Sequence, residues 1–388
     1  MPIKNRLAEM HDEITGWRRY LHQHPELMYD VHETAAFVVE RLKEFGIDDI
    51  TTGIGKTGVV ARIRGKSDTA GRVIGLRADM DALPITEVTG LDHASTVPGK
   101  MHACGHDGHT AMLLGAAKYL SETRNFDGTA VLIFQPAEEG GGGGKAMVDD
   151  GLMDRWGIQE VYGMHNMPGM PEGQFAIRPG ALLASSDEFE IIVTGKGGHA
   201  AAPHMAVDTT LVAAQTVVTL QSIVARNVDP IQRVVVTVGT FNTDSDASNI
   251  IAQTVRMKGT VRTLDPEWRD RAQDRVRRIA EDTASAFGAK AEVIWDPGYP
   301  ATINWPEQTT FAAEAARIVA GDVDEKVDPI LPAEDFAYML EARPGAYMFI
   351  GNGDTAMCHH PAYDFADETI PAGCSWFAEL VERRMPAQ

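Results

Sequence analysis

Short apolar runs alternate with helical patterns through the first half of the chain. Residues 73–76 and 130–134 have the length and composition of buried strands, and a helical pattern begins between them at Thr110. This alternation is typical of an α/β layer with a largely parallel sheet. We therefore predict an α/β domain whose mostly parallel sheet carries helices on both faces.

The pattern changes after Pro179-Gly180. The next block predicts a strand, a helix, two antiparallel strands, a helix and a final strand, over residues 187–193, 207–224, 233–240, 254–261, 266–287 and 291–295. That order predicts a small α+β domain. A helix over 309–319 and a buried strand over 346–351 then follow. We predict a discontinuous catalytic domain, residues 1–183 and 297–388, interrupted by a satellite domain, residues 184–296.

Composition narrows the class of protein. With 388 residues, 44% of them hydrophobic, the chain can bury two cores, and a net charge of -20 disfavours nucleic acid and anionic membranes as partners. Only three cysteines are present, which does not suggest a disulfide framework. The N-terminus has no signal-peptide core and no apolar run approaches the roughly 20 residues of a membrane span. We expect a cytoplasmic protein that acts on a small molecule.

The segment Met101 to His109 carries three imidazoles, a thiol and a carboxylate within nine residues. Histidine and thiolate are preferred ligands of borderline-soft transition metals, and two glycines allow the backbone to bring these side chains together. A polar turn before a helix would use glycine and aspartate but has no need of a thiol and several histidines. The segment therefore predicts a metal site.

Other candidate ligands follow the predicted strands. Asp79 and Asp81 follow the run 73–76, Glu138 and Glu139 follow 130–134, and His165 follows an apolar run ending at Met164. His359 comes shortly after the buried strand 346–351. Because sites of parallel α/β sheets assemble at the carboxyl edge of the strands, we expect these side chains to meet there.

The adjacent pair Glu138 and Glu139 predicts a division of labour. Neighbouring residues of an extended backbone point to opposite sides, so the two carboxylates cannot readily play one part. One can bind a metal while the other takes a proton from metal-activated water. Two solvated acids before a loop remain the structural alternative.

Six segments together resemble the metal-dependent amidohydrolases of the aminoacylase and carboxypeptidase family, in particular the branch of hippurate hydrolase and auxin-conjugate hydrolases. They are residues 21–27, 76–84, 101–110, 135–144, 197–200 and 359–365. The resemblance covers nearly the whole chain. It implies a zinc-peptidase-like catalytic domain and a satellite domain that mediates assembly into a homodimer or homotetramer.

The resemblance also implies the site. Its two divalent metal ions, Zn, Mn, Co or Ni, would be held by Cys104, His106, Glu139, His165 and His359. Glu138 would be the general base and acid. In the satellite domain, His199 would lie near the substrate carbonyl, and Asn249 and Arg262 near its carboxylate end, where an arginine can hold a carboxylate through two hydrogen bonds.

One feature departs from the family pattern and a second is ambiguous. The wider family has His-x-Asp where this chain has Asp79-Met80-Asp81, so either aspartate could contact metal or the ligand could be lost. In the C-terminal motif the spacing to proline selects His359 over His360.

Four further histidines are expected to support the site rather than to bind metal. We interpret His22 and His24 as structural, and His102 and His109 as groups that support the ligands by hydrogen bonds.

These observations predict an enzyme, a hydrolase that cleaves the amide bond of N-acyl amino acids of the hippurate or N-acetyl type with metal-activated water. A dipeptidase or carboxypeptidase acting on unacylated peptides would share every metal residue. A metal-binding protein without catalytic activity is the third reading, but it has no use for Glu138 beside Glu139.

Overall fold

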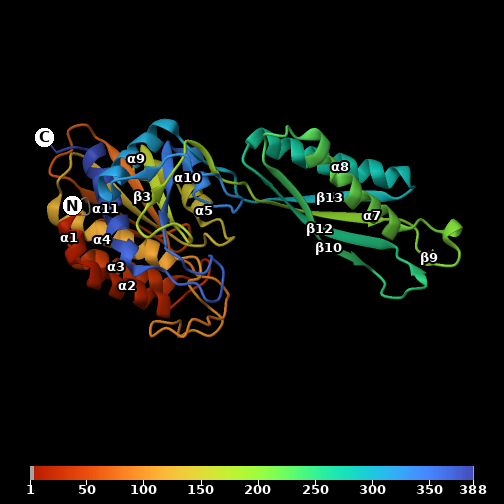
Figure 1. Cartoon of the computed structure of the whole chain (residues 1–388), viewed down its shortest axis with the longest axis horizontal. Helices are drawn as coiled ribbons and strands as arrows, with labels where there is room; N and C mark the ends of the chain where they lie inside the picture. The colour runs from red at the N-terminus through yellow and green to blue at the C-terminus, as the bar shows by residue number, and fades with distance from the viewer. Residues whose placement is uncertain (1–3, 388) are drawn as a thin grey trace. The chain divides into compact units, whose positions relative to one another are not determined.

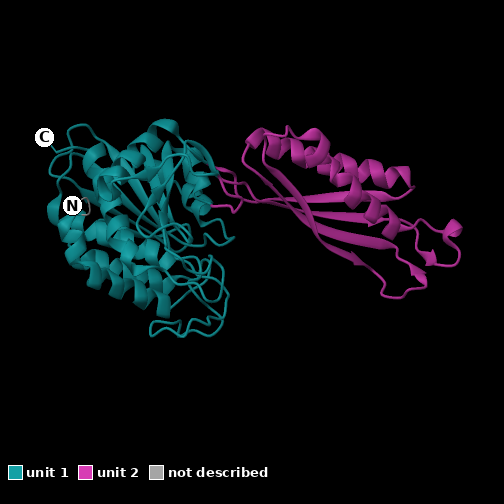
Figure 2. Cartoon of the chain, viewed as in Figure 1, with its two compact units in different colours: residues 1–182, 303–328, 335–388 teal, residues 183–302, 329–334 magenta. Residues whose placement is uncertain are grey.

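An eight-stranded sheet with helices around it forms the larger part of the molecule (Figure 1). The computed structural model describes residues 4–387. The chain divides into two units, and unit 1 comprises Met1–Leu182, Ile303–Asp328 and Asp335–Gln388 (Figure 2). Unit 2 comprises Leu183–Thr302 and Pro329–Glu334. Unit 2 therefore takes in Leu183 and residues 297–302 and 329–334, which the sequence pattern had placed in the catalytic domain.

The sheet of unit 1 has the order β1-β2-β4-β3-β5-β16-β6-β15. Its strands are β1 (Ile50–Ile54), β2 (Gly58–Arg64), β3 (Val73–Asp79), β4 (Thr129–Gln135), β5 (Glu160–Met167), β6 (Phe175–Ala176), β15 (Val323–Asp324) and β16 (Gly345–Gly351). The four central strands, β4, β3, β5 and β16, are parallel to one another, and β1 and β2 add an antiparallel edge. The predicted fold class is confirmed.

Strands β3 and β4 are buried along almost their whole length, which requires that both faces of the sheet are covered. Ile74, Leu76 and Ala78 belong to one large apolar core, whereas Gly75 and Arg77 alternate with them and lie on the other face. The helices of unit 1 are α1 (Asn5–Glu9), α2 (His11–Gln23), α3 (His32–Glu44), α4 (His106–Thr123), α5 (Gly143–Asp149), α6 (Leu152–Arg155), α9 (Pro306–Ala320), α10 (Ala337–Ala342), the 3-10 turn η3 (Asp367–Thr369) and α11 (Ile370–Arg384). The layered arrangement is that of the predicted α/β domain.

Unit 2 is built on a four-stranded antiparallel sheet of order β10-β12-β8-β13. Its elements are β8 (Asp187–Thr194), β9 (Gly198–His199), the 3-10 turn η1 (Pro203–Met205), α7 (Thr209–Leu220), the π-helical turn η2 (Ile223–Asn227), β10 (Val234–Thr243), β11 (Ile250–Ile251), β12 (Thr254–Thr263), α8 (Pro266–Ala286) and β13 (Lys290–Pro297). The strands bury alternate residues against α7 and α8, as expected for a sheet covered on one face. Strands β7 (Gly180–Leu183) and β14 (Thr302–Asn304) form a separate pair.

The two helices of unit 2 begin where capping chemistry predicts. Asp208 accepts hydrogen bonds from the amides of Thr210 and Leu211, and Asp265 accepts one from the amide of Trp268 at 3.1 Å. Pro266 occupies the first turn of α8, where its missing N–H costs no hydrogen bond. Within residues 4–387, the helices are all too short or too polar to cross a bilayer.

Candidate metal centre

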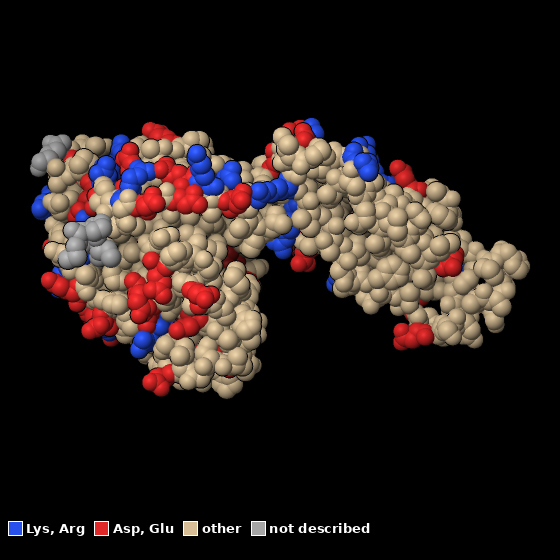
Figure 3. All heavy atoms as spheres, viewed as in Figure 1, with Lys and Arg blue, Asp and Glu red and all other residues tan. Residues whose placement is uncertain are grey.

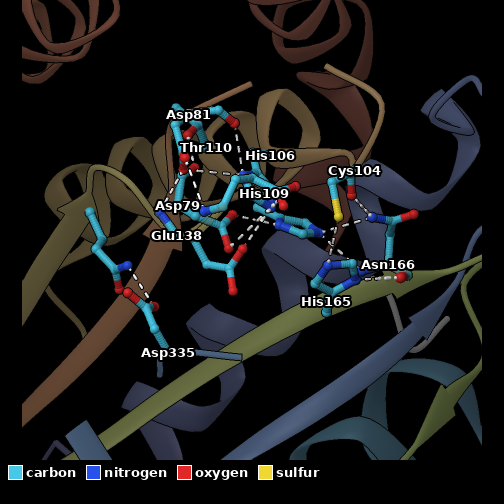
Figure 4. A network of polar contacts seen from close by, with 12 residues as sticks. Asp79, Asp81, Cys104, His106, His109, Thr110, Glu138, His165, Asn166 and Asp335 are labelled. Carbon is cyan, nitrogen blue, oxygen red and sulfur yellow. Dashed lines mark hydrogen bonds and ion pairs between the residues drawn. The ribbon is translucent and has the colours of Figure 1, made fainter. Parts of the chain in front are cut away.

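The central strands of unit 1 bring the predicted site residues to one edge of the sheet (Figure 4). Strand β3 ends at Asp79, Glu138 follows β4, and β5 carries His165 near its end. Strands β4 and β5 lie on opposite sides of β3, so the order in which successive strands are added to the sheet reverses at β3. Helix α4, which follows β3, begins at His106. This is the position at which parallel α/β sheets assemble their sites.

Potential ligand atoms form overlapping groups in which all atoms lie within 4.8 Å of one another. One group contains Cys104, His106 and His165, and a second contains Cys104, Glu139 and His359. A third contains His106, Glu138 and Glu139. The fold therefore brings together all five side chains predicted as ligands, together with the predicted base. Their role as ligands stays a prediction.

The two central histidines are oriented by main-chain carbonyls. His106 Nδ1 lies 2.8 Å from the carbonyl oxygen of Asp81, and His165 Nδ1 lies 2.6 Å from that of Asn166. A carbonyl can only accept, so both rings carry their proton on Nδ1 and direct Nε2 into the cluster. His165 Nε2 lies 3.4 Å from Cys104 Sγ. This orientation by a partner on the far ring nitrogen is usual for metal-binding histidine.

Two buried polar atoms at the centre of the cluster support its fit to a cation. His106 Nε2 and Glu139 Oε1 lie 3.9 Å apart and form no hydrogen bond among residues 4–387, although Glu139 Oε1 also lies 3.3 Å from His359 Nε2. Unsatisfied buried polar atoms are costly, and a cation would satisfy both. A thiol, three imidazoles and carboxylates suit Zn, Co or Ni, and the oxygen ligands also admit Mn.

Asp79 and Asp81 form hydrogen bonds next to the cluster, and Asp79 also belongs to a group with His106 and His109 that could hold a cation. Asp79 accepts from Arg77 at 2.6 Å and is bonded to His109 at 2.7 Å. Despite its burial, the positive charge of Arg77 holds the pKa of Asp79 well below its usual range. Burial raises the pKa of Asp81. Burial would lower the pKa of His106, but the charges of Asp79 and Asp81 raise it well above its usual value.

The glutamate pair lies in a turn, which corrects the expectation of an extended backbone. Ala137 has a positive φ of 53° and begins the turn. The amides of Glu138 and Glu139 donate to the two oxygens of Asp81 at 2.9 and 3.1 Å. Both carboxylates consequently approach His106, at 4.0 and 3.9 Å. Glu139 alone also reaches His359, at 3.3 Å, so the two acids are distinguished by their partners and not by opposite orientation.

The C-terminal motif places His359, and not His360, at the cluster. The amide of His359 donates to the carbonyl oxygen of Ala103 at 2.7 Å, and its φ of 67° directs the side chain to Glu139. His360 instead accepts a hydrogen bond from the amide of Ala362 and is exposed. Glu139 raises the pKa of His359, as expected for an ion pair.

His109 forms hydrogen bonds on both ring nitrogens, and His22 is buried with an acidic partner, as a structural histidine would be. Both ring nitrogens of His109 are engaged, one by Asp79 and the other by the amide of Asn166 at 3.0 Å. His22 is buried and pairs with Asp107 at 2.8 Å. His24 lies outside the cluster, where its ring is bonded to the carbonyl oxygen of Tyr20.

The prediction that His102 supports the ligands by hydrogen bonds is wrong. Neither of its ring nitrogens has a hydrogen-bond partner within the described residues, and the ring is only 1% exposed. Burial lowers the pKa of His102 to about 3, so this ring is neutral.

Asn166 and Tyr363 were not expected at the site. Asn166 donates to the carbonyl oxygen of Cys104 at 2.6 Å, and Tyr363 donates to Asn166 at 2.7 Å. Gly105, with a φ of 88°, packs against Asn166. Only glycine fits there, because an added Cβ would lie 2.3 Å from Asn166 Nδ2. The position of Asn166 directly after His165 was the only signal in the sequence.

Asp335 holds the segment that carries the glutamates at both ends. It accepts from Gln135 Nε2 at 2.7 Å and from the amide of Gly144 at 2.7 Å, and it pairs with Arg77 at 3.2 Å. An added Cβ at position 144 would lie 2.8 Å from the main-chain oxygen of Asp335, so the close approach requires glycine. Asp335 is fully buried and appears beside Glu138 in Figure 4.

Cys358 also lies at the site, although no sequence motif indicated it. Its Sγ lies 4.0 Å from the carbonyl oxygen of Cys104. The thiol of Cys358 also interacts with that of Cys104, which raises the pKa of Cys104 and lowers that of Cys358 to about 6.

The predicted substrate residues of unit 2 fall into two groups. His199 pairs with Ile250 in the β9–β11 ladder, and the amide of Ala200 donates to the carbonyl oxygen of Asn249, so His199 and Asn249 are neighbours. Arg262 lies eight residues beyond the start of β12, which is roughly 26 Å at about 3.3 Å per residue. The structure therefore does not bring Arg262 to His199 and Asn249 within unit 2.

Comparison with known proteins identifies the family. Residues 75–383 match the family described as Peptidase family M20/M25/M40. The chain belongs to this family, which confirms the resemblance inferred from the motifs and the prediction of a hydrolase.

Three relatives illustrate the similarity. The chain is 44% identical over 380 residues to an N-acetyl-L-cysteine deacetylase of Bacillus subtilis, covering 98% of this chain and 89% of the relative. It is 41% identical over 377 residues to a hippurate hydrolase of Campylobacter jejuni, covering 96% and 97%. A solved structure from Bacillus subtilis, described as a dinuclear metal-binding peptidase of the M20 family, superposes with a TM-score of 0.86 at 35% identity, covering 98% of this chain and all of that one.

Proposed function

We propose that this protein hydrolyses the amide bond of N-acyl amino acids with a metal-activated water molecule. The observation that carries the proposal is the pair of glutamates in unit 1. Glu139 approaches Cys104 and His359 as well as His106, whereas the only predicted ligands that share a group with Glu138 are His106 and Glu139. Glu139 is therefore placed to bind a cation, and Glu138 is placed to move a proton beside it. The names of the two curated relatives support an acylated amino acid as substrate.

The metal ions would be held by Cys104, His106, Glu139, His165 and His359. Divalent ions bound there supply a Lewis acid for the substrate carbonyl and lower the pKa of water from 15.7 to about 7. Glu138 accepts the proton of that water and delivers it to the leaving amine. Asp81 fixes the main chain of both glutamates, which keeps the base in place during the transfer.

Zinc, manganese, cobalt and nickel all fit this set of ligands. We propose two such ions for each chain, because the dinuclear relative of known structure supports this number.

Recognition of the substrate carboxylate is assigned to Arg262. The guanidinium is half-buried near the charges of Glu188 and Asp187, and it could hold a substrate carboxylate through two hydrogen bonds. His199 would stabilise the oxyanion and Asn249 would contact the substrate. An N-acyl amino acid is much shorter than the separation of Arg262 from His199. These residues could contact one substrate only if they came from two copies of the chain.

A homodimer through unit 2 agrees with its surface. Leu211, Val218 and Val224 are exposed by 55%, 65% and 42%, and they follow one another along α7 and the turn after it. On the face drawn in Figure 3, charged side chains are numerous over unit 1 and sparse over much of unit 2. Uncharged exposed apolar surface is typical of an interface. We propose a dimer that works in the cytoplasm.

A substrate panel and one variant test the function. We expect turnover of N-acetyl and N-benzoyl amino acids and little turnover of unacylated dipeptides. Glu138→Gln should retain the metal content and lose about 100-fold to 10,000-fold in kcat. Preference for unacylated dipeptides would indicate a dipeptidase, and normal kcat in Glu138→Gln would refute the role of this residue.

Mixing two inactive variants tests the contribution of a second copy. Glu138→Gln and His199→Ala are each expected to be inactive as homodimers, but exchanged subunits should recover about a quarter of the wild-type activity if His199 acts in the site of its partner. This fraction follows from random pairing, in which half of the dimers are mixed and each has one intact site. If activity does not recover although subunit exchange has been demonstrated, His199 and Glu138 act in the site of the same chain.

A further inference from the structure

The cluster contains a second thiol that the proposed hydrolysis does not use. Cys358 precedes His359, and its Sγ lies 4.0 Å from the main-chain oxygen of Cys104. Because the chain has only three cysteines, a contact between two of them in segments more than 250 positions apart is a specific feature of the fold.

The two chain segments are held together next to the cysteines. The amide of His359 donates to the carbonyl oxygen of Ala103 at 2.7 Å, and each of these residues is the neighbour of one cysteine. Asn166 fixes the carbonyl of Cys104 from another direction at 2.6 Å. These bonds hold the two cysteines next to each other, as an intramolecular disulfide between them requires.

The two thiols differ in access to solvent. Cys104 is 7% exposed, whereas Cys358 is half-buried in a segment whose neighbours, Met357 and His359, are exposed. Cys374 is fully buried in α11. An oxidant from solvent therefore reaches Cys358 before the other two.

We propose that Cys104 and Cys358 form a redox modification site, in which a peroxide oxidises the pair to an intramolecular disulfide. The sulfur of Cys358 attacks one peroxide oxygen, the O–O bond breaks, and the products are a sulfenic acid and one water molecule. The sulfur of Cys104 then attacks the sulfenic sulfur and displaces hydroxide, which leaves as water with the thiol proton. In sum, two thiols lose two electrons and two protons, and one hydrogen peroxide becomes two water molecules.

The disulfide competes with metal binding. The sulfur of Cys104 also lies 3.4 Å from His165 Nε2 and belongs to two of the groups that could hold a cation. A sulfur bound in a disulfide is no longer a thiolate ligand. This consequence rests on the proposed role of Cys104, but formation of the disulfide does not. Metal should therefore protect the pair, and oxidation should prevent full loading with metal.

The experiment exposes the full-length protein to hydrogen peroxide, both as the metal-loaded enzyme and after removal of the metal by a chelator. In the metal-free protein we expect the free thiols to fall from three to one, with a peptide that links positions 104 and 358 and a mass loss of two hydrogen atoms. Dithiothreitol should restore all thiols and the capacity for metal. The metal-loaded enzyme should lose its free thiols at least about tenfold more slowly than the metal-free protein.

Two variants separate this inference from simple oxidation. Cys358→Ser should retain metal and turnover. Peroxide should add oxygen to this variant without forming a disulfide, and dithiothreitol should not restore its lost activity. Cys374→Ser should behave as the wild type. Oxygen addition to Cys104 without a linkage in the wild type, or equal reversible inactivation of Cys358→Ser, would overturn the proposal. If the disulfide forms while metal content stays complete, the redox site stands and the role of Cys104 as a ligand is wrong.

Discussion

The two groups of predicted site residues differ in how the fold holds them. In unit 1, the residues around the cluster are buried and have several fixed partners, as Asp79 does with Arg77 and His109. In unit 2, His199 and Asn249 are exposed on a two-residue ladder. The supporting groups of a buried polar centre need fixed partners in the fold, because each unsatisfied group is costly, whereas His106 Nε2 and Glu139 Oε1, which would face a cation, are left without a hydrogen bond. Exposed groups can remain hydrated until the substrate contacts them.

The largest effect should come from breaking the buried side of this comparison. Glu139→Ala removes the carboxylate that reaches His106 and His359. We expect the metal affinity to fall by more than about a hundredfold, which exceeds the usual effect of replacing a residue that only orients a ligand. Turnover should fall by about a thousandfold or more. Metal titration and kinetics measure both. His199→Ala should keep its metal, and an equal loss there would contradict the division between the units.

Arg262→Ala tests the substrate-binding residues proposed in unit 2. Hydrogen bonds to charged groups contribute about 1.5–3 kcal/mol, so kcat/KM for substrates with a free carboxylate should fall about 10-fold to 100-fold. Amides without the carboxylate should change little. Equal losses on both substrate types would show that Arg262 supports the structure of unit 2 and does not recognise the carboxylate.

Asp335→Asn tests whether the turn that carries Glu138 must be fixed from both ends. The amide can accept only on one side, so either Gly144 or the pair of Gln135 and Arg77 loses its acceptor. We expect kcat to fall about tenfold with little change in KM, because the base shifts while the substrate groups remain. Asp127→Asn, which replaces another buried loop anchor, is the matched control. A loss confined to thermal stability would make Asp335 purely structural.

The smallest effect should be a change of stability with pH. Burial disfavours the charged form of His22, but the charge of Asp107 raises the pKa of His22 to about 9, above its ordinary 6.5. The resulting stabilisation is complete below pH 6.5 and is lost as the pH rises through 9. The free energy of unfolding should therefore decrease across this window in the wild type and less so in His22→Gln. His204→Gln, at an exposed site in unit 2, should retain the wild-type profile. Parallel curves for His22→Gln and the wild type would contradict the pairing.

Much of the architecture could be predicted, because burial gives strands and helices a characteristic spacing of apolar residues along the sequence. The runs 73–76 and 130–134 became the centres of β3 and β4, and the helix predicted over 266–287 is α8. The helical pattern over 207–224 instead ends at Leu220 and continues as a π-helical turn. The hairpin of β1 and β2 and helices α2, α3 and α11 were not anticipated, since their burial depends on neighbours distant in the chain.

The site was predictable to the extent that its residues are concentrated in motifs. Cys104, His106 and the glutamate pair stand out by density, and strand ends indicated His165. Arg77, Asn166 and Asp335 could not be found in this way, because each acts through long-range hydrogen bonds that only the folded chain reveals. The separation of Arg262 from His199 is equally invisible before the register of β12 is known.

The central claim is that residues from several strand ends of unit 1 hold divalent metal ions. Diffraction from crystals of the metal-loaded protein, measured on both sides of the absorption edge of the metal, locates those ions directly. We expect anomalous peaks within about 2.0–2.3 Å of ligand atoms of Cys104, His106, Glu139, His165 and His359. Peaks that lie elsewhere, in a fully loaded protein that hydrolyses N-acyl amino acids, would contradict it.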